Sequence, residues 1–356
     1  MKRITHTNSP LIEAPSSEPL NELPSTLRYM NTRYFDYERE LAHPKTSDPD
    51  TWKKWRSDLR RRLRQTLRLD TMGNVPTPSP QVLEESQEDG YRRYKLAYET
   101  LPNNWARAFL LVPDGGPKRK PAAICPHGHV PGCMRGVAIP DPDSPVGVAY
   151  GHELAQRGVI VLAPESAGMG ERQPASEHQK HIHAGACFLL WTRLNHMGMD
   201  LTGLRIFELM AGLNLLQSRD DVISSRIGAA GLSGGCWLSQ VLTALDSRVK
   251  ACILSGFFTT FPQTIWYCHC ICHHPFGIGQ YCDMPDISAL IAPRPLFVES
   301  GVQDLDYPHQ PAFDMTQRIY EQLAAPENVG LHRYDGGHMF HGGESIPWLV
   351  DRLKGL

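Results

Sequence analysis

Residues 231–235, Gly231-Leu-Ser-Gly-Gly235, have the types and the spacing of a serine nucleophile set between glycines. An apolar run at 227–230 precedes them, and apolar residues at helical spacing follow from Trp237 to Leu245. The first pattern is typical of a buried strand and the second of an amphipathic helix. A sharp turn between strand and helix lifts the serine hydroxyl above a sheet, and the flanking glycines let two backbones cross closely. The pattern therefore predicts that Ser233 is a nucleophile.

The proton of the serine hydroxyl needs an acceptor, because a hydroxyl is a weak nucleophile at neutral pH. His338 is the predicted base among the 16 histidines, since Gly336 and Gly337 precede it and free its loop to approach the serine. The two other histidines nearby, His332 and His341, are expected in or near the last strand and at the surface. A histidine base also needs a carboxylate that fixes its tautomer.

Asp304 is the predicted carboxylate. It stands three residues after Gly301, at the end of an expected strand at 296–299, where a short turn aims it toward the histidine loop. Two rivals are close by. Asp306 lies nearer to Pro308 and is expected to be solvated or to cap a helix, and Glu299 lies at the end of the strand itself. Position favours Asp304.

The negative oxygen that forms during acyl transfer needs N–H donors that are already in place. We expect one from the backbone of Gly234, directly after the nucleophile. The second is expected from the backbone of His129, in the loop Pro126-His-Gly-His-Val-Pro131. The side chain of His127 is expected only to hold this loop through hydrogen bonds.

The order of elements places these loops at one edge of a sheet. Strands and helices alternate from residue 121 onward, which predicts a parallel sheet with its functional groups after the carboxyl ends of the strands. The expected strands lie at 122–125, 159–163, 227–230, 251–254, 296–299 and 329–334, and the expected helices at 148–157 and 204–216.

The N-terminal quarter has a different composition. Residues 1–25 are rich in Pro, Ser, Asn and Glu, which favours a loosely held arm. Residues 49–69 form an expected amphipathic helix. Arg60, Arg61, Arg62 and Arg64 are expected on solvated faces, with an interaction patch as the alternative. A Pro-rich stretch at 75–80 then marks a boundary, which divides the chain into an arm and helix at 1–75 and a catalytic domain at 76–356.

Five segments together resemble the α/β-hydrolase superfamily, and within it the branch of acetyl xylan esterases, dienelactone hydrolases and prolyl-oligopeptidase-like enzymes. They are His127-Gly-His129, residues 154–171, the Ser233 motif, Ala292-Pro-Arg-Pro-Leu296 and Gly336-Gly-His338. The resemblance implies a mostly parallel central sheet with helices on both faces, here with an N-terminal helical extension. It also implies an acyl-enzyme mechanism without a cofactor or metal. Glu165 stands where this branch often has Asp, a position that is usually structural.

A run of Cys and His residues between the expected strands at 251–254 and 296–299 offers soft ligands. Cys268, His269, Cys270, Cys272, His273 and His274 are followed by Cys282. Zinc is one interpretation, but an extended segment would point alternate residues to opposite sides. We therefore expect no metal and interpret the run as an insertion over the active site with reduced cysteines. Residues 177–183 are a second expected insertion, interpreted either as a lid that lines the substrate pocket or as a solvent-exposed polar loop.

Composition narrows the class of protein. The chain has 356 residues and a formal charge of -2, which gives no reason to expect nucleic acid or an anionic membrane as a partner. An apolar run of membrane-spanning length and a secretory leader are not visible, and nine cysteines are an odd number. A cytoplasmic location is the expectation.

The sequence thus predicts a serine carboxylic ester hydrolase that acts on a small-molecule ester with a short acyl group, such as an acetyl ester of a carbohydrate. A peptidase or a C–C bond hydrolase with the same triad is an alternative. A zinc-binding protein that uses the Cys268 to Cys282 run is another.

Overall fold

Nine strands form one sheet in the computed structural model, which describes residues 29, 38–174, 186–265, 269–304 and 307–355. Their order in the sheet is β1-β2-β3-β5-β4-β6-β7-β8-β9. The strands are β1 (Gln81–Glu88), β2 (Tyr91–Leu101), β3 (Asn104–Pro113), β4 (Lys120–Ile124), β5 (Ile160–Pro164), β6 (Val222–Leu232), β7 (Val249–Ser255), β8 (Leu296–Gly301) and β9 (Val329–Tyr334).

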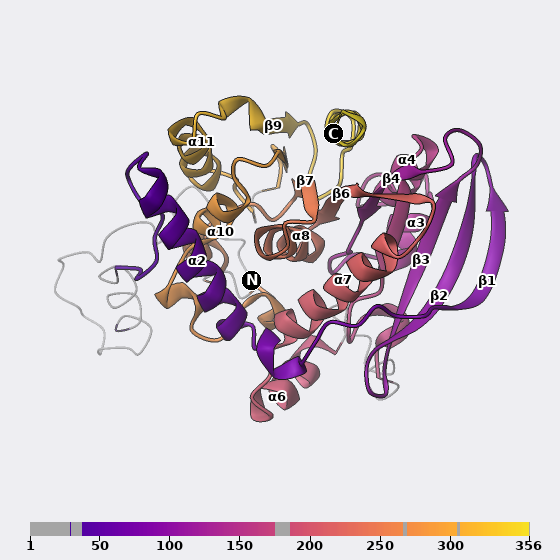
Figure 1. Ribbon diagram of the computed structural model, residues 1–356, viewed down its shortest axis with the longest axis horizontal. Helices are drawn as coiled ribbons and strands as arrows, with labels where there is room; N and C mark the ends of the chain where they lie inside the picture. Colours follow the sequence, from indigo (N-terminus) through magenta and orange to yellow (C-terminus); the bar gives the residue numbers. More distant parts are fainter. Residues whose placement is uncertain (1–28, 30–37, 175–185, 266–268, 305–306, 356) are drawn as a thin grey trace.

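The sheet has an antiparallel side and a parallel side. β1, β2 and β3 form a meander, and β3 pairs antiparallel with β5. From β5 to β9 every neighbouring pair is parallel. The meander forms one lateral edge of the molecule (Figure 1). The mostly parallel sheet predicted from the alternation of elements is confirmed.

Helices cover both faces of this sheet. They are α2 (Pro49–Thr66), α3 (Met134–Ala138), α4 (Tyr150–Gln156), α6 (Cys187–His196), α7 (Leu201–Gln217), α8 (Gly234–Leu245), α9 (Phe261–Ile265), α10 (Met284–Ile291), α11 (Ala312–Gln322) and α12 (Ser345–Lys354). Short 3-10 turns lie at η2 (Leu69–Met72), η3 (Gly170–Arg172), η4 (Ile271–His273), η5 (Ile278–Gln280) and η6 (Pro326–Asn328).

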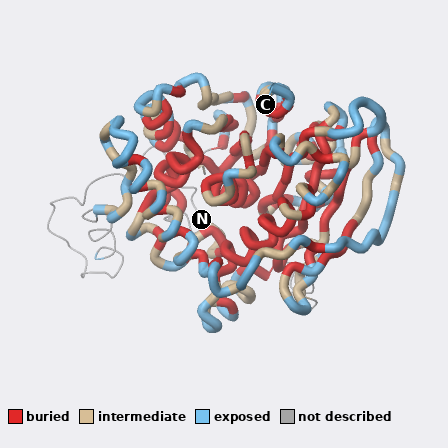
Figure 2. The backbone as a smooth tube through the Cα atoms, in the orientation of Figure 1, coloured by how far each residue is buried: buried red, intermediate tan, exposed pale blue. Residues whose placement is uncertain are grey.

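Alternate residues of each central strand enter two separate cores. In β5, Ile160 and Leu162 belong to the core that also contains residues of α2, α7, α8, α10 and α11, while Val161 and Ala163 belong to the core that contains residues of α3, α4 and α12. This alternation is the period of two that strands impose on their side chains. The residues at the centre of the sheet are therefore buried, whereas most residues of the edge strand β1 are exposed (Figure 2).

The N-terminal helix α2 shares the larger core. Asp48 caps it by accepting the backbone N–H of Thr51 at 2.9 Å, and Pro49 occupies the first turn. The predicted apolar stripe of the helix is buried against the body of the protein, where it consists of Trp52, Trp55, Leu59, Leu63 and Leu67. In Figure 1 the helix lies alongside α8 and α10.

The expectation that all four arginines of this helix are solvated is wrong for two of them. Arg61 and Arg64 are exposed, as expected. Arg60 is half-buried and donates to the carbonyl oxygens of Ala244, in the last turn of α8, and Leu290, in the last turn of α10. The guanidinium of Arg62 stacks on the ring of Tyr281 at 4.3 Å. The long side chains reach sideways to partners that a helical projection does not include.

Among the described residues, helices of the length and apolar character needed to cross a bilayer are absent.

Candidate active site

Ser233 occupies the sharp turn between β6 and α8. Its backbone has φ 60° and ψ -122°, in the left-handed range of φ that side chains rarely adopt. Its N–H donates to the carbonyl oxygen of Ser255, at the end of β7, at 2.9 Å. The strained turn predicted from the sequence is therefore present.

Close packing around this turn requires glycine at three positions. A Cβ added to Gly231 would collide with the backbone of Gly235, and a Cβ added to Gly235 would collide with that of Pro126. A Cβ on Gly128 would lie 2.6 Å from Leu232 O and 2.7 Å from Gly234 N. The loop after β4 therefore rests directly on the turn that carries Ser233.

His338 and Asp304 form a pair in two different loops at the same edge of the sheet. His338 Nδ1 lies 2.8 Å from Asp304 Oδ2, so Nδ1–H can donate to the carboxylate and leave Nε2 free. Asp304 is buried and follows β8, whereas His338 follows β9 and is partly exposed.

Ser255 links the histidine loop to the turn of Ser233. Its carbonyl oxygen accepts the Ser233 N–H, and its hydroxyl donates to the carbonyl oxygen of Met339 at 3.2 Å. The His338 ring itself packs over Gly256, where an added Cβ would lie 3.1 Å from the ring carbon Cε1. One residue at the end of β7 thus fixes the nucleophile turn and the histidine loop relative to each other.

The rival acid Glu299 has a structural role. This fully buried carboxylate accepts the backbone N–H groups of His341 and Gly342 and the hydroxyl of Ser345. It therefore holds the chain between His338 and α12. The other rival, Asp306, lies outside the described residues. His332 lies in β9 near Glu344, and the exposed His341 stacks on Tyr334, so both stay outside this pairing as expected.

His127 holds its loop, as predicted. Its Nδ1 lies 2.7 Å from the carbonyl oxygen of Gly128, and its Nε2 lies 3.0 Å from the backbone N of Ser166 and 2.6 Å from a Glu165 oxygen. Glu165 also accepts the backbone N–H groups of Met134 and Glu171. Both side chains brace the loop that rests on the Ser233 turn.

The His129 side chain makes contacts that the sequence did not suggest. Its Nε2 lies 3.3 Å from the sulfur of Cys187 and 3.4 Å from the sulfur of Cys272. The Cys272 sulfur is in turn 3.3 Å from that of Cys270. Hydrogen bonds from Cys270 and Cys272 lower the pKa of the Cys187 thiol far below its usual value. None of the described cysteines forms a disulfide.

Residues 270–273 are not extended, so the objection that an extended Cys and His run would point alternate residues to opposite sides does not apply to them. A 3-10 turn, η4, brings Cys270 and Cys272 to the same side, because such a turn does not alternate its side chains as a strand does. Cys187 was missed altogether. A single cysteine 83 residues before Cys270 carries no local signal, and only the tertiary fold brings the two together.

The same insertion reaches the Ser233 turn, as the interpretation of an insertion over the site requires. A Cβ on Gly234 would lie 2.7 Å from His273 Nε2. His273 Nδ1 and His269 Nδ1 are 2.7 Å apart. The ring centroid of Tyr307 lies 5.2 Å from that of His269 and 5.0 Å from that of His338, so the rings form a chain from His273 to His338. Burial and the neighbouring His129 lower the pKa of His269 to about 3, and burial lowers that of His273 strongly. Both rings are therefore neutral at physiological pH.

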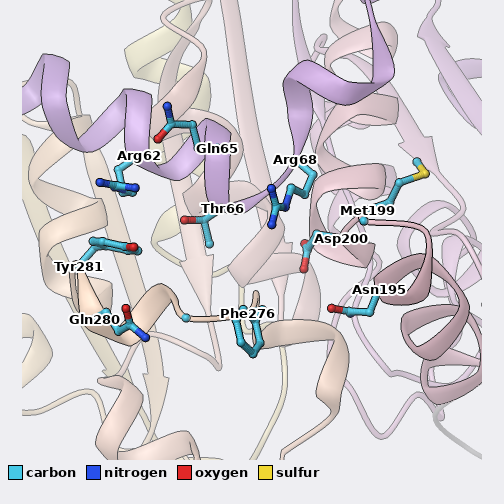
Figure 3. Close-up of a pocket in the computed structure, with 12 residues that line it drawn as sticks. Arg62, Gln65, Thr66, Arg68, Asn195, Met199, Asp200, Phe276, Gln280 and Tyr281 are labelled. Carbon is cyan, nitrogen blue, oxygen red and sulfur yellow. The ribbon is translucent and has the colours of Figure 1, made fainter.

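A separate pocket of about 290 Å³ lies between α2, the start of α7 and the insertion (Figure 3). Arg62, Arg68, Asp200, Phe276 and Tyr281 are among its lining residues. It contains none of Ser233, Asp304 and His338, so it is distinct from the candidate active site.

Two of the sequence-based expectations cannot be placed. The expected insertion at 177–183 and Cys268 lie outside the described residues.

Comparison with known proteins agrees with this architecture. A sequence model of the Abhydrolase family matches residues 32–345. The chain belongs to the α/β-hydrolase family. It is also 26% identical over 255 residues to YtaP of Bacillus subtilis (strain 168), a candidate hydrolase by name, and this match covers 68% of the chain and 80% of YtaP.

Solved structures share the fold at low sequence identity. A candidate acetyl xylan esterase from Bacteroides fragilis NCTC 9343 has a TM-score of 0.73 and 21% identity, covering 90% of this chain and 84% of its own. Methylesterase BT1017 has a TM-score of 0.66 and 24% identity, covering 93% and 67%. A glucuronoyl esterase from Solibacter usitatus has a TM-score of 0.62 and 13% identity, covering 89% and 98%.

Proposed function

We propose that this α/β-hydrolase family member is a serine carboxylic ester hydrolase with Ser233 as nucleophile, His338 as base and Asp304 as orienting acid. The observation that carries the proposal is the meeting of three loops. The strained turn of Ser233 and the loop of His338 are both bound to Ser255, and His338 is paired with a buried carboxylate. These are the parts that acyl transfer needs in one place.

In the proposed mechanism the Ser233 hydroxyl oxygen attacks the ester carbonyl carbon while His338 Nε2 accepts the hydroxyl proton. The carbonyl π electrons move to the oxygen, which the backbone N–H groups of Gly234 and His129 bind. Collapse of this intermediate breaks the bond to the alcohol oxygen, which takes the proton from His338. Water then repeats the sequence on the acyl-serine, and the carboxylic acid leaves.

Asp304 acts through His338 in this scheme. Its carboxylate accepts Nδ1–H at 2.8 Å, which keeps the proton off Nε2 in the resting enzyme. It also stabilises the imidazolium that forms during each transfer.

We propose a short acyl group on a carbohydrate or a similar alcohol as the substrate. Support for the short acyl group comes from the solved relative named as an acetyl xylan esterase. The names methylesterase and glucuronoyl esterase support ester hydrolysis in general. The neutral ring of His273 lies beside Gly234, and the rings of His269, Phe257 and Tyr307 connect it to His338. These uncharged polar and aromatic rings favour an uncharged polar alcohol.

The test is a series of para-nitrophenyl esters from acetate to octanoate, together with acetylated xylo-oligosaccharides. We expect kcat/KM to be highest for acetate and to fall as the acyl chain lengthens. Ser233→Ala should lose turnover and labelling by a fluorophosphonate probe. Turnover undiminished in Ser233→Ala, or turnover of peptides or diketones in preference to all esters, would contradict the proposal.

A further inference from the structure

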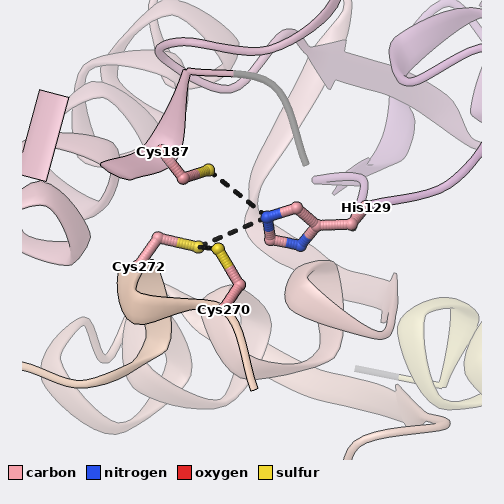
Figure 4. A group of neighbouring side chains, drawn as sticks. All are labelled: His129, Cys187, Cys270 and Cys272. Carbon is pink, nitrogen blue, oxygen red and sulfur yellow. Dashed lines mark hydrogen bonds between the residues drawn. The ribbon is translucent and has the colours of Figure 1, made fainter. Parts of the chain in front are cut away.

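Four ligand atoms from three separate segments converge beside the candidate active site. They are His129 Nε2 after β4, Cys187 Sγ at the start of α6, and the sulfurs of Cys270 and Cys272 at η4 (Figure 4). All four lie within 4.8 Å of one another, and the contacts described above are 3.3 to 3.4 Å. A tetrahedral zinc ion with three thiolates and one imidazole sets its ligand atoms about 3.6 to 3.8 Å apart. The observed distances between the ligand atoms, from 3.3 Å up to at most 4.8 Å, span this range.

The charge around the cluster fits three thiolates and a divalent cation. Arg205 is 3% exposed and donates to the Cys187 sulfur at 3.2 Å and to the carbonyl oxygen of Ala167 at 2.7 Å. Among the described residues, the hydrogen bonds of its guanidinium go to these two acceptors and none goes to a carboxylate. A buried guanidinium needs a counter-charge. Zinc with three thiolates carries a net charge of -1, which Arg205 balances.

We propose that His129, Cys187, Cys270 and Cys272 bind one structural Zn²⁺ ion. The donor set is three soft sulfurs and an imidazole nitrogen, which is typical of zinc. All four positions of a tetrahedron are filled by protein, so the ion has no open position for water or substrate. Binding displaces the protons of the three thiols and involves no change of oxidation state.

The ion would join the loop after β4 to α6 and to the insertion. The insertion is also fixed to α7, because the hydroxyl of Thr202 donates to the carbonyl oxygen of Cys272 at 2.6 Å. His129 supplies a backbone N–H to the oxyanion in the proposed function, and on that basis the zinc site is a positioning device for the oxyanion loop. The metal itself takes no part in the chemical steps.

The first test measures metal on the full chain, purified without a histidine tag. We expect about one zinc per chain by inductively coupled plasma mass spectrometry. Replacement of the metal by cobalt should give the visible bands of tetrahedral cobalt with thiolate-to-metal charge transfer. A metal-free protein, or a mass that shows a disulfide within the cluster, would overturn the proposal.

Variants locate the ligands. Cys187→Ser and Cys272→Ser should each hold less than roughly 0.2 zinc per chain. Cys282→Ala is the matched control, because Cys282 belongs to the same run but is buried elsewhere in the core, and it should keep the full amount. His129→Cys retains four ligands and should keep both the zinc and the fold. Loss of zinc from Cys282→Ala alone would overturn the ligand assignment.

Activity measurements separate the site from the proposed function. Chelation should lower the midpoint of thermal unfolding by more than about 5 °C and lower kcat more than it raises KM. The metal content, the cobalt spectrum and the melting shift do not depend on ester hydrolysis. Zinc-bound protein without esterase activity would support the site and contradict the proposed function. An active esterase without zinc would support the proposed function and contradict the zinc site.

Discussion

Two buried carboxylates lie in or just after β8, Glu299 within the strand and Asp304 in the loop that follows it, and their hydrogen-bond partners separate their roles. Glu299 faces backbone N–H groups and a serine hydroxyl, whereas Asp304 faces an imidazole nitrogen. An acid that orients a base must meet the base, and an acid that holds a loop must meet backbone donors. Substitution of each should therefore affect a different property of the protein.

Asp304→Asn is expected to lower kcat by about 10⁴-fold while the protein stays folded. The asparagine amide donates where the carboxylate accepts, which favours the imidazole tautomer with its proton on Nε2, and that nitrogen then cannot act as a base. Steady-state kinetics with an acetate ester, with circular dichroism as a control for folding, will measure the effect. Activity within tenfold of the wild type would remove Asp304 from the mechanism.

Glu299→Gln is expected to act on stability. The carboxylate accepts three hydrogen bonds in a fully buried site, and a glutamine amide turns one acceptor into a donor that faces other donors. We expect a loss of about 1–3 kcal/mol in the free energy of unfolding, measured by urea denaturation. Unchanged stability together with a large fall in kcat would reverse the roles of the two acids.

At the scale of elements, the helices, strands and turns that could be predicted from the sequence are those whose signal lies within a short, contiguous segment. The turn of Ser233 was visible because the strand, the glycines and the helix are contiguous, and the parallel strands followed from alternation. The first half of β6 was missed because residues 224–226 are polar and only partly covered, unlike the buried half that follows. The contact between His129 and Cys187 was missed because it joins distant segments, and the turn of η4 was missed because the pattern of the run was assumed to be extended.

Gly128→Ala should lower kcat by about 100-fold with an intact fold. The new Cβ would meet backbone and side-chain atoms of residues 232–234 at 2.6 to 2.7 Å, so the loop of His129 must move away from the turn. Displacement of about 1 Å at such a site costs roughly that factor. Gly279→Ala is the control, because its Cβ would meet nothing within 4 Å. Equal kinetics for the two variants would contradict the close fit of loop and turn.

On the scale of the whole molecule, α2 is fastened to the catalytic body through its arginines as well as its apolar stripe. Arg60 donates to the end carbonyls of α8 and α10, whereas Arg61 makes an exposed ion pair with Asp58. We expect Arg60→Ala to lower the free energy of unfolding by about 1–2 kcal/mol and Arg61→Ala by less than about 0.5 kcal/mol. Urea denaturation of both variants checks the difference, and equal losses would show that Arg60 behaves as a surface residue.

The dependence of stability on pH should include a contribution from Asp200, the cap of α7. Its carboxylate accepts the backbone N–H of Gly203, and burial raises its pKa to about 6. The folded state then binds the proton more tightly than the unfolded chain, whose pKa is 3.8. The stability that this group contributes is therefore present at low pH and is lost as the pH rises through 6. At pH 8 the cost of the buried charge is about 3 kcal/mol.

Asp200→Asn removes the charge and keeps a cap. The difference in unfolding free energy between this variant and the wild type should therefore grow in favour of the variant by about 1–2 kcal/mol between pH 5 and pH 8. Asp200→Ala also lacks the charge but loses the cap, so its curve should run parallel to that of Asp200→Asn and lie about 1 kcal/mol lower. Urea denaturation at several pH values measures all three proteins. A constant difference between the wild type and Asp200→Asn would mean that Asp200 is already ionised throughout this range, and the stability of the helix that packs behind the Ser233 strand would then be independent of its titration.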